Sequence, residues 1–305
     1  MSPFEALLQQ EKIAVERDAV LAPLTSFHIG GKADYFVSVT DAKAVETVLR
    51  AAKQTATPLF VLGNGSNLLV SDRGIRGAVL HLKGNRITRE ENTLTAFAGT
   101  SLSALCIEAQ KAGLSGLEFA FGIPGSVGGA VFMNAGAYGG EMANVLKTVT
   151  FLDENGAVQT LPAKELQLGY RTSVFKQNGA IILSAAVELS PDSPENIKQK
   201  MDDFLARRKE KQPLEWPSAG STFKRPEGHF AGALIEQCGL KGLAVGDAAV
   251  SEKHAGFIIN KGKATARDVR QLIETVRRTV LRQTGVLLEP EVLAVGQTEE
   301  DDVVL

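Results

Sequence analysis

The chain has 305 residues, 44% of them hydrophobic, with 33 basic and 35 acidic side chains and a net charge of −2. That length favours two or three domains, and the apolar content supports a sizeable core. The near-neutral charge, without a basic tract, argues against nucleic acid as the main partner. No apolar run approaches the ~18 residues that a membrane span needs, so no membrane partner is expected.

The cysteines and the N-terminus bear on the cellular compartment. Cys106 and Cys238 are far apart and form no CxxC pair. This argues against a disulfide framework or a zinc site and favours a reducing compartment. The N-terminus is polar by residue 9, so no signal peptide is visible. We therefore expect a soluble, cytoplasmic protein without a metal ion.

The first third of the chain has a βαβ-like pattern. A short helix and a loop over 1–24 precede an expected strand at 35–39 and a helix at 41–53, with Thr40 as its cap. Strands are expected at 58–62 and 68–70. Alternating apolar residues within 77–98 then predict two antiparallel strands, at 78–82 and 93–97.

The turn between the strands at 58–62 and 68–70 is Gly63-Asn-Gly-Ser-Asn67. A dinucleotide-binding fingerprint fails here, because Leu68 replaces the third glycine and no acid follows about 20 residues later. The turn can still present several N–H groups to a pyrophosphate. Asn-Gly is also a strong hairpin signal, and the residues alone leave both interpretations open.

The rest of the chain is organised around the stretch from Gly113 to Gly140, called the glycine segment below. It follows a helix expected from Ser101 to about Ala112. Nine of the 30 glycines of the chain lie in it, among apolar residues, so it is not a flexible linker, which would be polar. Either its glycines allow close backbone packing, or their N–H groups form nests around a flat, phosphate-bearing ligand.

Beyond the glycine segment the pattern predicts strands near 147–153, 157–161 and 180–188, with Asn155-Gly156 as a hairpin turn. A boundary is expected at 191–194, followed by a helix that ends in the basic patch 207–211. A helix ending at Gly239, a loop and a strand over 245–260, and a helix opened by a capping box at Thr265 follow. A last strand is expected at 286–295.

Five motifs occur in a fixed order, and together they resemble one enzyme family. They are Gly63–Leu68, Gly122–Gly129 with Asn134–Gly139, Gly169–Ser173, Gly220–Lys224 and Glu289–Val292. Their order and content, from about Phe27 to Gly296, resemble the UDP-N-acetylenolpyruvoylglucosamine reductase family. The interval between Arg171 and Ser221 is short and lacks an inserted tyrosine-bearing loop, which resembles the type II form.

The resemblance implies an α+β fold, with the FAD-binding fold of the vanillyl-alcohol-oxidase/PCMH type and a C-terminal α+β substrate-binding domain. The implied domains are FAD-binding subdomains at 1–84 and 85–192 and a substrate domain at 193–305, whose last strand could return to the FAD domain. The implied FAD-binding residues are Asn64, Gly65, Ser66, Asn67, Leu68, Gly122, Ile123, Pro124, Gly125, Ser126, Gly128, Gly129, Asn134, Ala135, Gly136, Ala137 and Tyr138.

The resemblance also implies the reaction, which reduces the enolpyruvyl ether of UDP-N-acetylglucosamine to the lactyl ether for peptidoglycan. NADPH reduces FAD, hydride passes from flavin N5 to the enol ether, and Ser221 donates a proton. Arg171 would pair with the substrate carboxylate, and Glu291, rather than Glu289, would be the catalytic acid. The implied substrate-binding residues are Tyr170, Lys211, Lys224 and His254. The expected partner is this small molecule, and nothing in the sequence indicates an oligomeric state.

Simpler roles exist for each catalytic candidate. By residue type alone, Arg171 could be a surface arginine, Ser221 a turn or cap serine and Glu291 a charge at a strand edge. Two other functions also fit the fold: an FAD-dependent alcohol oxidase, or a flavin or nucleotide-sugar binding protein without turnover. No histidine or cysteine lies in the glycine segment to tether a flavin covalently, and both catalytic motifs are complete, so the reductase is favoured.

Overall fold

The computed structural model describes residues 1–297, which fold into two compact units. Unit 1 consists of 1–16, 35–64 and 78–208, and unit 2 of 17–34, 65–77 and the described residues from 209 onward. Both units mix helices and strands, which confirms the α+β class. No helix within 1–297 is long and apolar enough to cross a membrane. Within the same residues no cluster of His, Cys, Asp or Glu could hold a metal ion.

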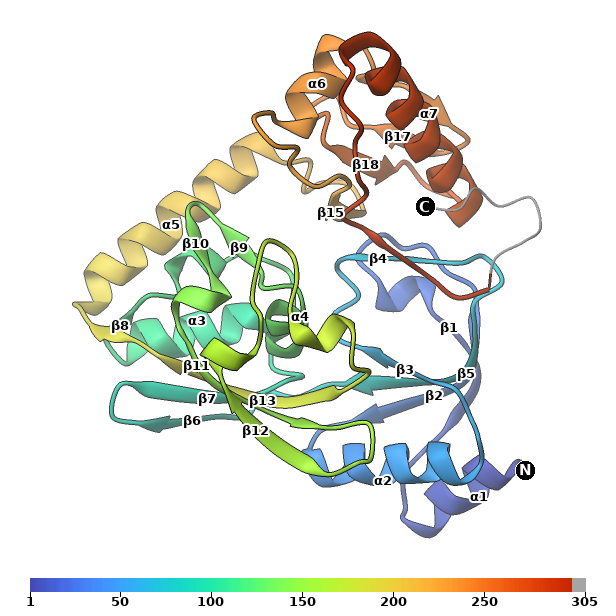
Figure 1. Ribbon diagram of the computed structural model, residues 1–305, viewed down its shortest axis with the longest axis vertical. Helices are drawn as coiled ribbons and strands as arrows, with labels where there is room; N and C mark the ends of the chain where they lie inside the picture. Colours follow the sequence, from blue (N-terminus) through green and yellow to red (C-terminus); the bar gives the residue numbers. More distant parts are fainter. Residues whose placement is uncertain (298–305) are drawn as a thin grey trace. The chain divides into compact units, whose positions relative to one another are not determined.

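Unit 1 contains helices packed against two larger sheets, and two short two-stranded sheets (Figure 1). Its helices are α1 (Pro3–Gln10), α2 (Ala42–Gln54), α3 (Leu102–Lys111), α4 (Val127–Phe132) and most of α5 (Pro194–Lys211). Its strands are β3 (Leu59–Leu62), β6 (Ile87–Glu90), β7 (Thr93–Phe97), β8 (Leu114–Ser115), β9 (Gly136–Ala137), β10 (Gly140–Glu141), β11 (Leu146–Leu152), β12 (Val158–Pro162), β13 (Ile181–Glu188) and β14 (Ser190–Pro191). Strands β9 and β10 form one of the short sheets, and β8 and β14 form the other. Strands β2 (Lys32–Val39) and β5 (Ile75–Leu82) begin in unit 2 and continue into unit 1.

The first sheet has the strand order β1-β2-β5-β3, where β1 is Glu16–Val20 and β3 pairs in parallel with β5. One apolar face of α2, which includes Val45 and Val48, is buried in the same hydrophobic core as residues of β2 and β5 from this sheet. The first turn of α2 is capped by Asp41, whose carboxylate accepts from the Ala44 amide at 3.0 Å. The predicted cap at Thr40 is therefore wrong by one residue, because the carboxylate of Asp41 reaches the third helical amide.

The second sheet is antiparallel, with the order β12-β11-β13-β7-β6. Strands β11 and β12 form the predicted hairpin around Asn155-Gly156. Helix α4 packs on β13, and α3 packs on α4. Of the two strands expected within 77–98, the one at 93–97 forms β7, which pairs antiparallel with β6 and β13. The one at 78–82 lies in β5, which belongs to the first sheet and pairs there in parallel with β3.

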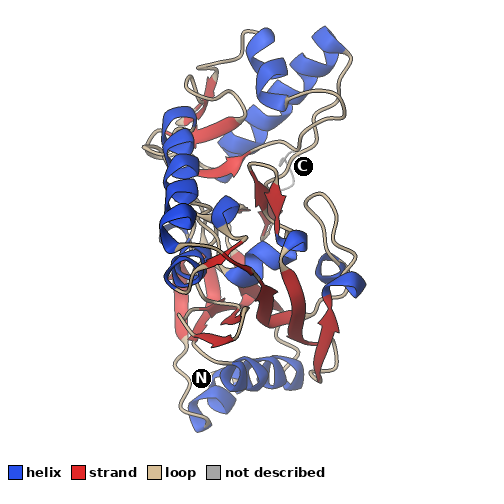
Figure 2. Ribbon diagram, turned by 90° about the vertical axis from the view of Figure 1, so that its left-hand side faces the viewer, coloured by secondary structure: helices blue, strands red, loops and turns tan. Residues whose placement is uncertain are grey.

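Unit 2 has a four-stranded sheet of its own, ordered β15-β18-β17-β16. The strands are β15 (Ser218–Ser221), β16 (Ala244–Val245), β17 (Ala248–Val250) and β18 (Phe257–Asn260), and the helices are α6 (Ala231–Gln237) and α7 (Ala266–Thr284). Helix α7 begins with the predicted capping box of Thr265 and Asp268 and ends at Gly285, which has a left-handed φ of 74°. Figures 1 and 2 show α6 and α7 beside this sheet, and their apolar faces share one core with it.

The last described strand, β19 (Leu293–Val295), forms a two-stranded parallel sheet in unit 2. It pairs with β4 (Leu68–Val70), with Leu293 opposite Leu68. Only these three residues of the predicted strand at 286–295 are extended in a ladder. Strands β3 and β4 belong to different sheets, so the turn at 63–67 is not a hairpin and that interpretation is wrong.

Candidate active site

The glycine segment folds as a series of short elements around α4. Ser126 caps this helix, and its Oγ accepts from the Gly129 amide at 3.2 Å. The amides of Val127 and Gly128 donate to backbone carbonyls, both at 2.8 Å. These three amides are satisfied by the protein, so they form no anion-binding nest. A Cβ on Gly128 would lie 2.9 Å from the Cβ of Ala98, so close packing explains this glycine.

The turn after β3 lies against the start of α4 within unit 1. Asn64 Nδ2 donates to Pro124 O at 3.4 Å, and a Cβ on Gly63 would come within 2.4 Å of Ser126 Oγ. Two of the five motifs therefore meet here. Within the described part of the chain, the amides of 64–66 donate to no protein acceptor. They remain available to an anion such as a pyrophosphate.

The turn continues into unit 2 through Gly65, which has a φ of 59°. A Cβ at this position would also lie 2.4 Å from Leu24 O, so conformation and close approach both require glycine. Two residues on, Asn67 Nδ2 donates to Glu291 O at 3.1 Å. The last predicted residue of this stretch, Leu68, begins β4.

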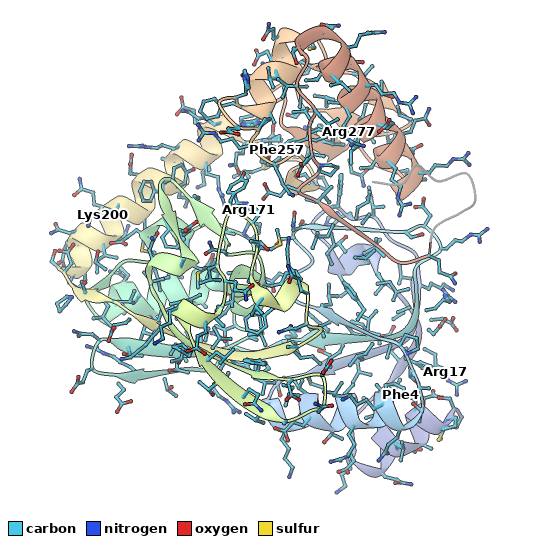
Figure 3. The ribbon with its side chains drawn as sticks, viewed as in Figure 1. Phe4, Arg17, Arg171, Lys200, Phe257 and Arg277 are labelled. Atoms are coloured by element: carbon cyan, nitrogen blue, oxygen red, sulfur yellow. The ribbon has the colours of Figure 1, made fainter. Side chains whose placement is uncertain are left out.

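Arg171 lies on the turn Gly169–Ser173, called the Arg171 loop below (Figure 3). The loop closes on itself through two backbone hydrogen bonds between Gly169 and Thr172, each 3.2 Å long. Arg171 has a left-handed φ of 55°, and its Nη2 donates to Gly136 O at 3.3 Å. Its guanidinium carbon lies 5.1 Å from the centroid of the Tyr170 ring, a residue that is 53% exposed.

Two buried side chains join the Arg171 loop to the glycine segment. Asn134 Nδ2 donates to Gly169 O at 3.0 Å, and Ser173 Oγ donates to Phe132 O at 2.7 Å. Asn134 is completely buried and Ser173 is 2% exposed. Unit 1 therefore holds its predicted substrate residues next to predicted cofactor residues of the glycine segment.

Helix α5 holds both ends of the predicted cofactor stretch in unit 1. The Tyr138 ring stacks on Phe204, with centroids 4.6 Å apart and planes 3° apart. One turn further along α5, Arg208 Nη1 donates to Gly122 O. Burial lowers the pKa of the Arg208 guanidinium, and the Tyr138 hydroxyl acts in the opposite direction. The Nε of Arg208 is buried without a hydrogen-bond partner in the described part of the chain.

In unit 2, Ser221 ends β15 at an irregularity of the sheet. Gly220 has a φ of 77°, and the register between β15 and β18 shifts just before Ser221. Ser221 is partly accessible, and its Oγ donates to Phe223 O at 3.2 Å. The next residue, Thr222, is buried, and its Oγ1 accepts from the Ile258 amide at 3.0 Å. The bulge therefore leaves the Ser221 hydroxyl accessible while Thr222 anchors the chain.

The segment 289–291 runs antiparallel to 222–224 in the same unit. The Glu291 amide donates to Thr222 O and the Lys224 amide donates to Glu289 O, both at 2.8 Å. Lys224 Nζ also forms an ion pair of 3.0 Å with Glu289, whose side chain is 66% exposed. Glu291 is less exposed than Glu289. Unit 2 thus brings Ser221, Lys224 and Glu291 onto two adjacent segments.

The two remaining predicted substrate residues also lie in unit 2. The Nδ1 of His254 accepts from the Gly256 amide at 3.1 Å, and its ring lies edge-on to Phe257 at 5.0 Å between centroids. Burial lowers the pKa of His254, and its contact with the backbone acts in the opposite direction. Lys211 is the exposed last residue of α5.

Sequence reasoning missed the residues that support the candidate site. Ser173 and Thr222 lie within two of the five motifs, so a closer reading of the motifs could have identified them. Phe204 and Arg208 are four residues apart on α5, the spacing that puts two side chains on one face of a helix. The sequence marked that stretch only as the end of a helix with a basic patch.

Comparison with known proteins gives the family. Residues 212–295 match the model of the UDP-N-acetylenolpyruvoylglucosamine reductase C-terminal domain, and residues 33–162 match that of an FAD binding domain. The reductase of Clostridium novyi (strain NT) is 50% identical over 98% of this chain and 97% of that protein. The chain belongs to the UDP-N-acetylenolpyruvoylglucosamine reductase family. The reductase of Clostridium perfringens (strain 13) is 49% identical over 94% of each chain.

Solved structures agree with membership of the reductase family. The crystal structure of the reductase (MurB) from Thermus caldophilus is 40% identical, has a TM-score of 0.80 and covers 92% of this chain and 99% of its own. A variant of Phl p 4, described as a glucose oxidase, is 13% identical with a TM-score of 0.51 over 94% of this chain and 64% of its own. That likeness shows the shared fold alone. The predicted family and fold are confirmed.

Proposed function

We propose that the chain reduces the enolpyruvyl ether of UDP-N-acetylglucosamine to the lactyl ether, UDP-N-acetylmuramate, in peptidoglycan synthesis, using FAD and NADPH. The observation that carries the proposal is the 50% identity, over 98% of the chain, to a protein named UDP-N-acetylenolpyruvoylglucosamine reductase. The chain is accordingly an oxidoreductase. Its partner is a small-molecule substrate, and we place the reaction in the cytoplasm, where NADPH and nucleotide sugars are made.

The residues proposed to hold FAD are those of the turn at 64–68 and of 122–126, 128–129 and 135–138. Three amides at 64–66 without a protein acceptor support this assignment, because a pyrophosphate needs N–H donors. Gly63 and Gly65, where a Cβ would meet other atoms at 2.4 Å, let the backbone turn tightly there. When bound there, FAD would supply the redox chemistry that connects NADPH with the enol ether.

Arg171 is the residue proposed to bind the substrate carboxylate. Addition of hydride to the enol ether drives negative charge onto that carboxylate, so the transition state needs a preorganised cation. A guanidinium is permanently charged and can donate two parallel N–H bonds to a carboxylate. The self-closed Arg171 loop and the hydrogen bond from Nη2 to Gly136 O support the role, because they limit the positions that the side chain can take. Tyr170 would contact the same carboxylate or the nicotinamide.

Ser221 is proposed to donate the proton to the carbon beside the carboxylate. A serine hydroxyl is a weak acid, so its oxygen needs stabilisation as the proton leaves. Lys224, three residues on, is the nearest candidate cation by sequence, and its ion pair with exposed Glu289 is of the weak surface kind. Lys224 can therefore turn toward the substrate at little cost. Lys211 and His254 complete the proposed substrate residues.

Glu291 is proposed to act beside Ser221 as a neutral acid or through a water. An ionised carboxylate next to the developing charge would repel it, so the protonated form is the useful one. Its backbone supports the role, because the Glu291 amide donates to Thr222 O and so ties the residue to the chain next to Ser221.

The testing experiment measures NADPH oxidation by the purified, FAD-loaded protein with and without UDP-N-acetylglucosamine enolpyruvate. We expect a yellow protein whose rapid oxidation of NADPH depends on the sugar nucleotide. A yellow protein that oxidises NADPH only through oxygen would keep the flavin fold and remove the substrate assignment, in favour of an oxidase. A flavin-bound protein with no turnover of either kind would favour a binding protein.

A further inference from the structure

Asn134 was expected to contact the cofactor, but its surroundings assign it another task. The side chain is completely buried, and its backbone has an unusual left-handed φ of 41°. Its Oδ1 accepts from the Ala143 amide at 2.9 Å, and its Nδ2 donates to Gly169 O at 3.0 Å. Because one neighbour is an N–H group and the other a carbonyl, the orientation of the amide is fixed by its partners.

Two further hydrogen bonds join the Arg171 loop to the glycine segment beside the bond from Asn134. Ser173 Oγ donates to Phe132 O at 2.7 Å, and Arg171 Nη2 donates to Gly136 O at 3.3 Å. The three contacts are spread along the Arg171 loop: its end binds residue 132, its start is bound by residue 134, and its middle binds residue 136. The loop is thus aligned against the glycine segment by side chains.

The tether at Gly169 matters because of the backbone of Arg171. A non-glycine residue with a left-handed φ, here 55°, persists only where its surroundings hold it. Gly169 O receives the Thr172 amide within the loop and the Asn134 amide from outside it. The Asn134 bond is therefore the contact that ties this closed turn to the rest of unit 1 at its first residue.

We infer that Asn134 is a positioning residue, which fixes the Arg171 loop so that the guanidinium meets the substrate carboxylate. The inference rests on the proposed function of Arg171. This role takes the place of the expected contact between the Asn134 side chain and the cofactor, because the oxygen and the nitrogen of its amide both bind protein groups. Loss of the tether would shift Arg171 without removing it, and a displacement of about 1 Å at a reacting group can lower a rate about 100-fold.

The test uses the FAD-loaded Asn134→Leu variant, which keeps a similar volume but has neither donor nor acceptor. After reduction by NADPH, oxidation of the flavin by UDP-N-acetylglucosamine enolpyruvate is followed anaerobically by stopped flow. We expect this step to slow about 10- to 100-fold. In an Arg171→Ala background the same substitution should cause almost no further slowing, because the residue acts through Arg171. A normal rate, or an effect that adds fully to that of Arg171→Ala, would overturn the inference.

Asn134→Asp gives a second measurement if the leucine variant does not fold. A neutral carboxyl group can donate to Gly169 O and accept from the Ala143 amide, whereas an ionised one turns an oxygen toward Gly169 O. The rate should therefore approach the wild-type value at low pH and fall as the carboxyl loses its proton. Asn144→Asp is the matched control, since exposed Asn144 also accepts a backbone amide through Oδ1, from Glu141 at 2.8 Å. If the rate of Asn134→Asp depends on pH in the same way as that of the Asn144→Asp control, the inference is contradicted.

Failure of the proposed function is separable from failure of this inference. If the wild-type protein does not oxidise reduced flavin with the enol ether, the proposed function fails. Hydrogen exchange of a peptide spanning 166–176 then tests the tether by itself. Exchange about tenfold faster in the variant at Asn134 than in the Asn144→Asp control would support the positioning role, and equal exchange would overturn it.

Discussion

The Arg171 loop of unit 1 and the Ser221–Glu291 pair of unit 2 carry the proposed chemistry, and the chain positions them in different ways. The Arg171 loop is joined to the glycine segment by the buried side chains of Asn134 and Ser173. Ser221 and Glu291 lie on segments joined by backbone bonds, from the Glu291 amide to Thr222 O and from the Lys224 amide to Glu289 O.

The difference has a consequence for mutation. Backbone hydrogen bonds between two segments do not depend on the side chains of those segments, so substitution at Ser221 or Glu291 should remove a functional group and leave its frame in place. A loop held by side chains can move when a neighbour changes, and Arg171 has a left-handed backbone that costs of order 1–3 kcal/mol when unsupported. The first region should thus be more sensitive to residues that never touch the substrate.

The largest effect is expected from Ser221→Ala, which removes the proposed proton donor. Loss of a general acid typically lowers a rate about 10²- to 10⁴-fold. Reduction of the flavin by NADPH should remain close to wild type, because it does not need this proton. Stopped-flow absorbance at the flavin band separates the two steps. Ser218→Ala in the same strand is the matched control, and a Ser221→Ala enzyme with normal turnover would show that another group supplies the proton.

A smaller loss, about 10²-fold, is expected from Arg171→Lys. Lysine keeps the charge but cannot form two parallel bonds with a carboxylate. Steady-state kinetics should show a fall in kcat with the enol ether while flavin binding is retained. Arg207→Lys is the control, since Arg207 is exposed and pairs with Asp203 at 2.8 Å on the surface of α5. An equal response of both variants would argue against a special role for Arg171.

Within unit 2, the two glutamates of the Glu-Pro-Glu-Val motif, Glu289 and Glu291, can be compared by substituting each one. Glu291→Gln should lower kcat about 10- to 100-fold, because an amide cannot replace the acid. Glu289→Gln should leave kcat within about twofold, since it only breaks a surface ion pair worth ~0–1 kcal/mol. Measured kcat values for the pair decide between the residues. The reverse ranking would move the catalytic role to Glu289.

The sequence predicted more of the fold than of the support for the site. Periodicity located α2, α3, α5 and α7, and the capping box at Thr265 was confirmed. Single-residue features were harder to predict. Asp41 caps α2, where Thr40 was expected. Of the strand expected at 286–295, only the last three residues pair in a ladder, with the three residues of β4. Sheet partners such as β3 with β5 depend on long-range pairing that local patterns do not contain.

Within the site, the motifs indicated which residues matter but not what each one contacts. Asn134 resembled a cofactor ligand, yet its amide is used between Ala143 and Gly169. The pattern of the glycine segment left close packing and ligand binding open. Close packing against Ala98 explains Gly128, and binding of a phosphate-bearing ligand by the segment stays a prediction.

The smallest effect concerns His254, whose titration should affect the backbone around Ser221. Its Nδ1 accepts from the Gly256 amide, and Gly256 O in turn accepts from the Thr222 amide at 2.8 Å. Burial holds the pKa of folded His254 below its usual value of 6.5. At a pH between the lowered pKa of folded His254 and 6.5, the unfolded chain binds more protons at this residue than the folded chain does. The contribution of neutral, buried His254 to folding stability is therefore complete above pH 6.5 and is lost as the pH falls below it.

We therefore expect His254→Gln to flatten the pH dependence of stability. Urea unfolding at pH 7.5 and at pH 5.5 should show a smaller loss of unfolding free energy in the variant than in the wild type. The other histidines are common to both proteins, so the difference between the two slopes isolates His254. His229→Gln, at an exposed position, should retain the wild-type slope. If His254→Gln also keeps that slope, protonation of His254 does not weaken the frame, and the backbone hydrogen bonds around Ser221 hold independently of this side chain.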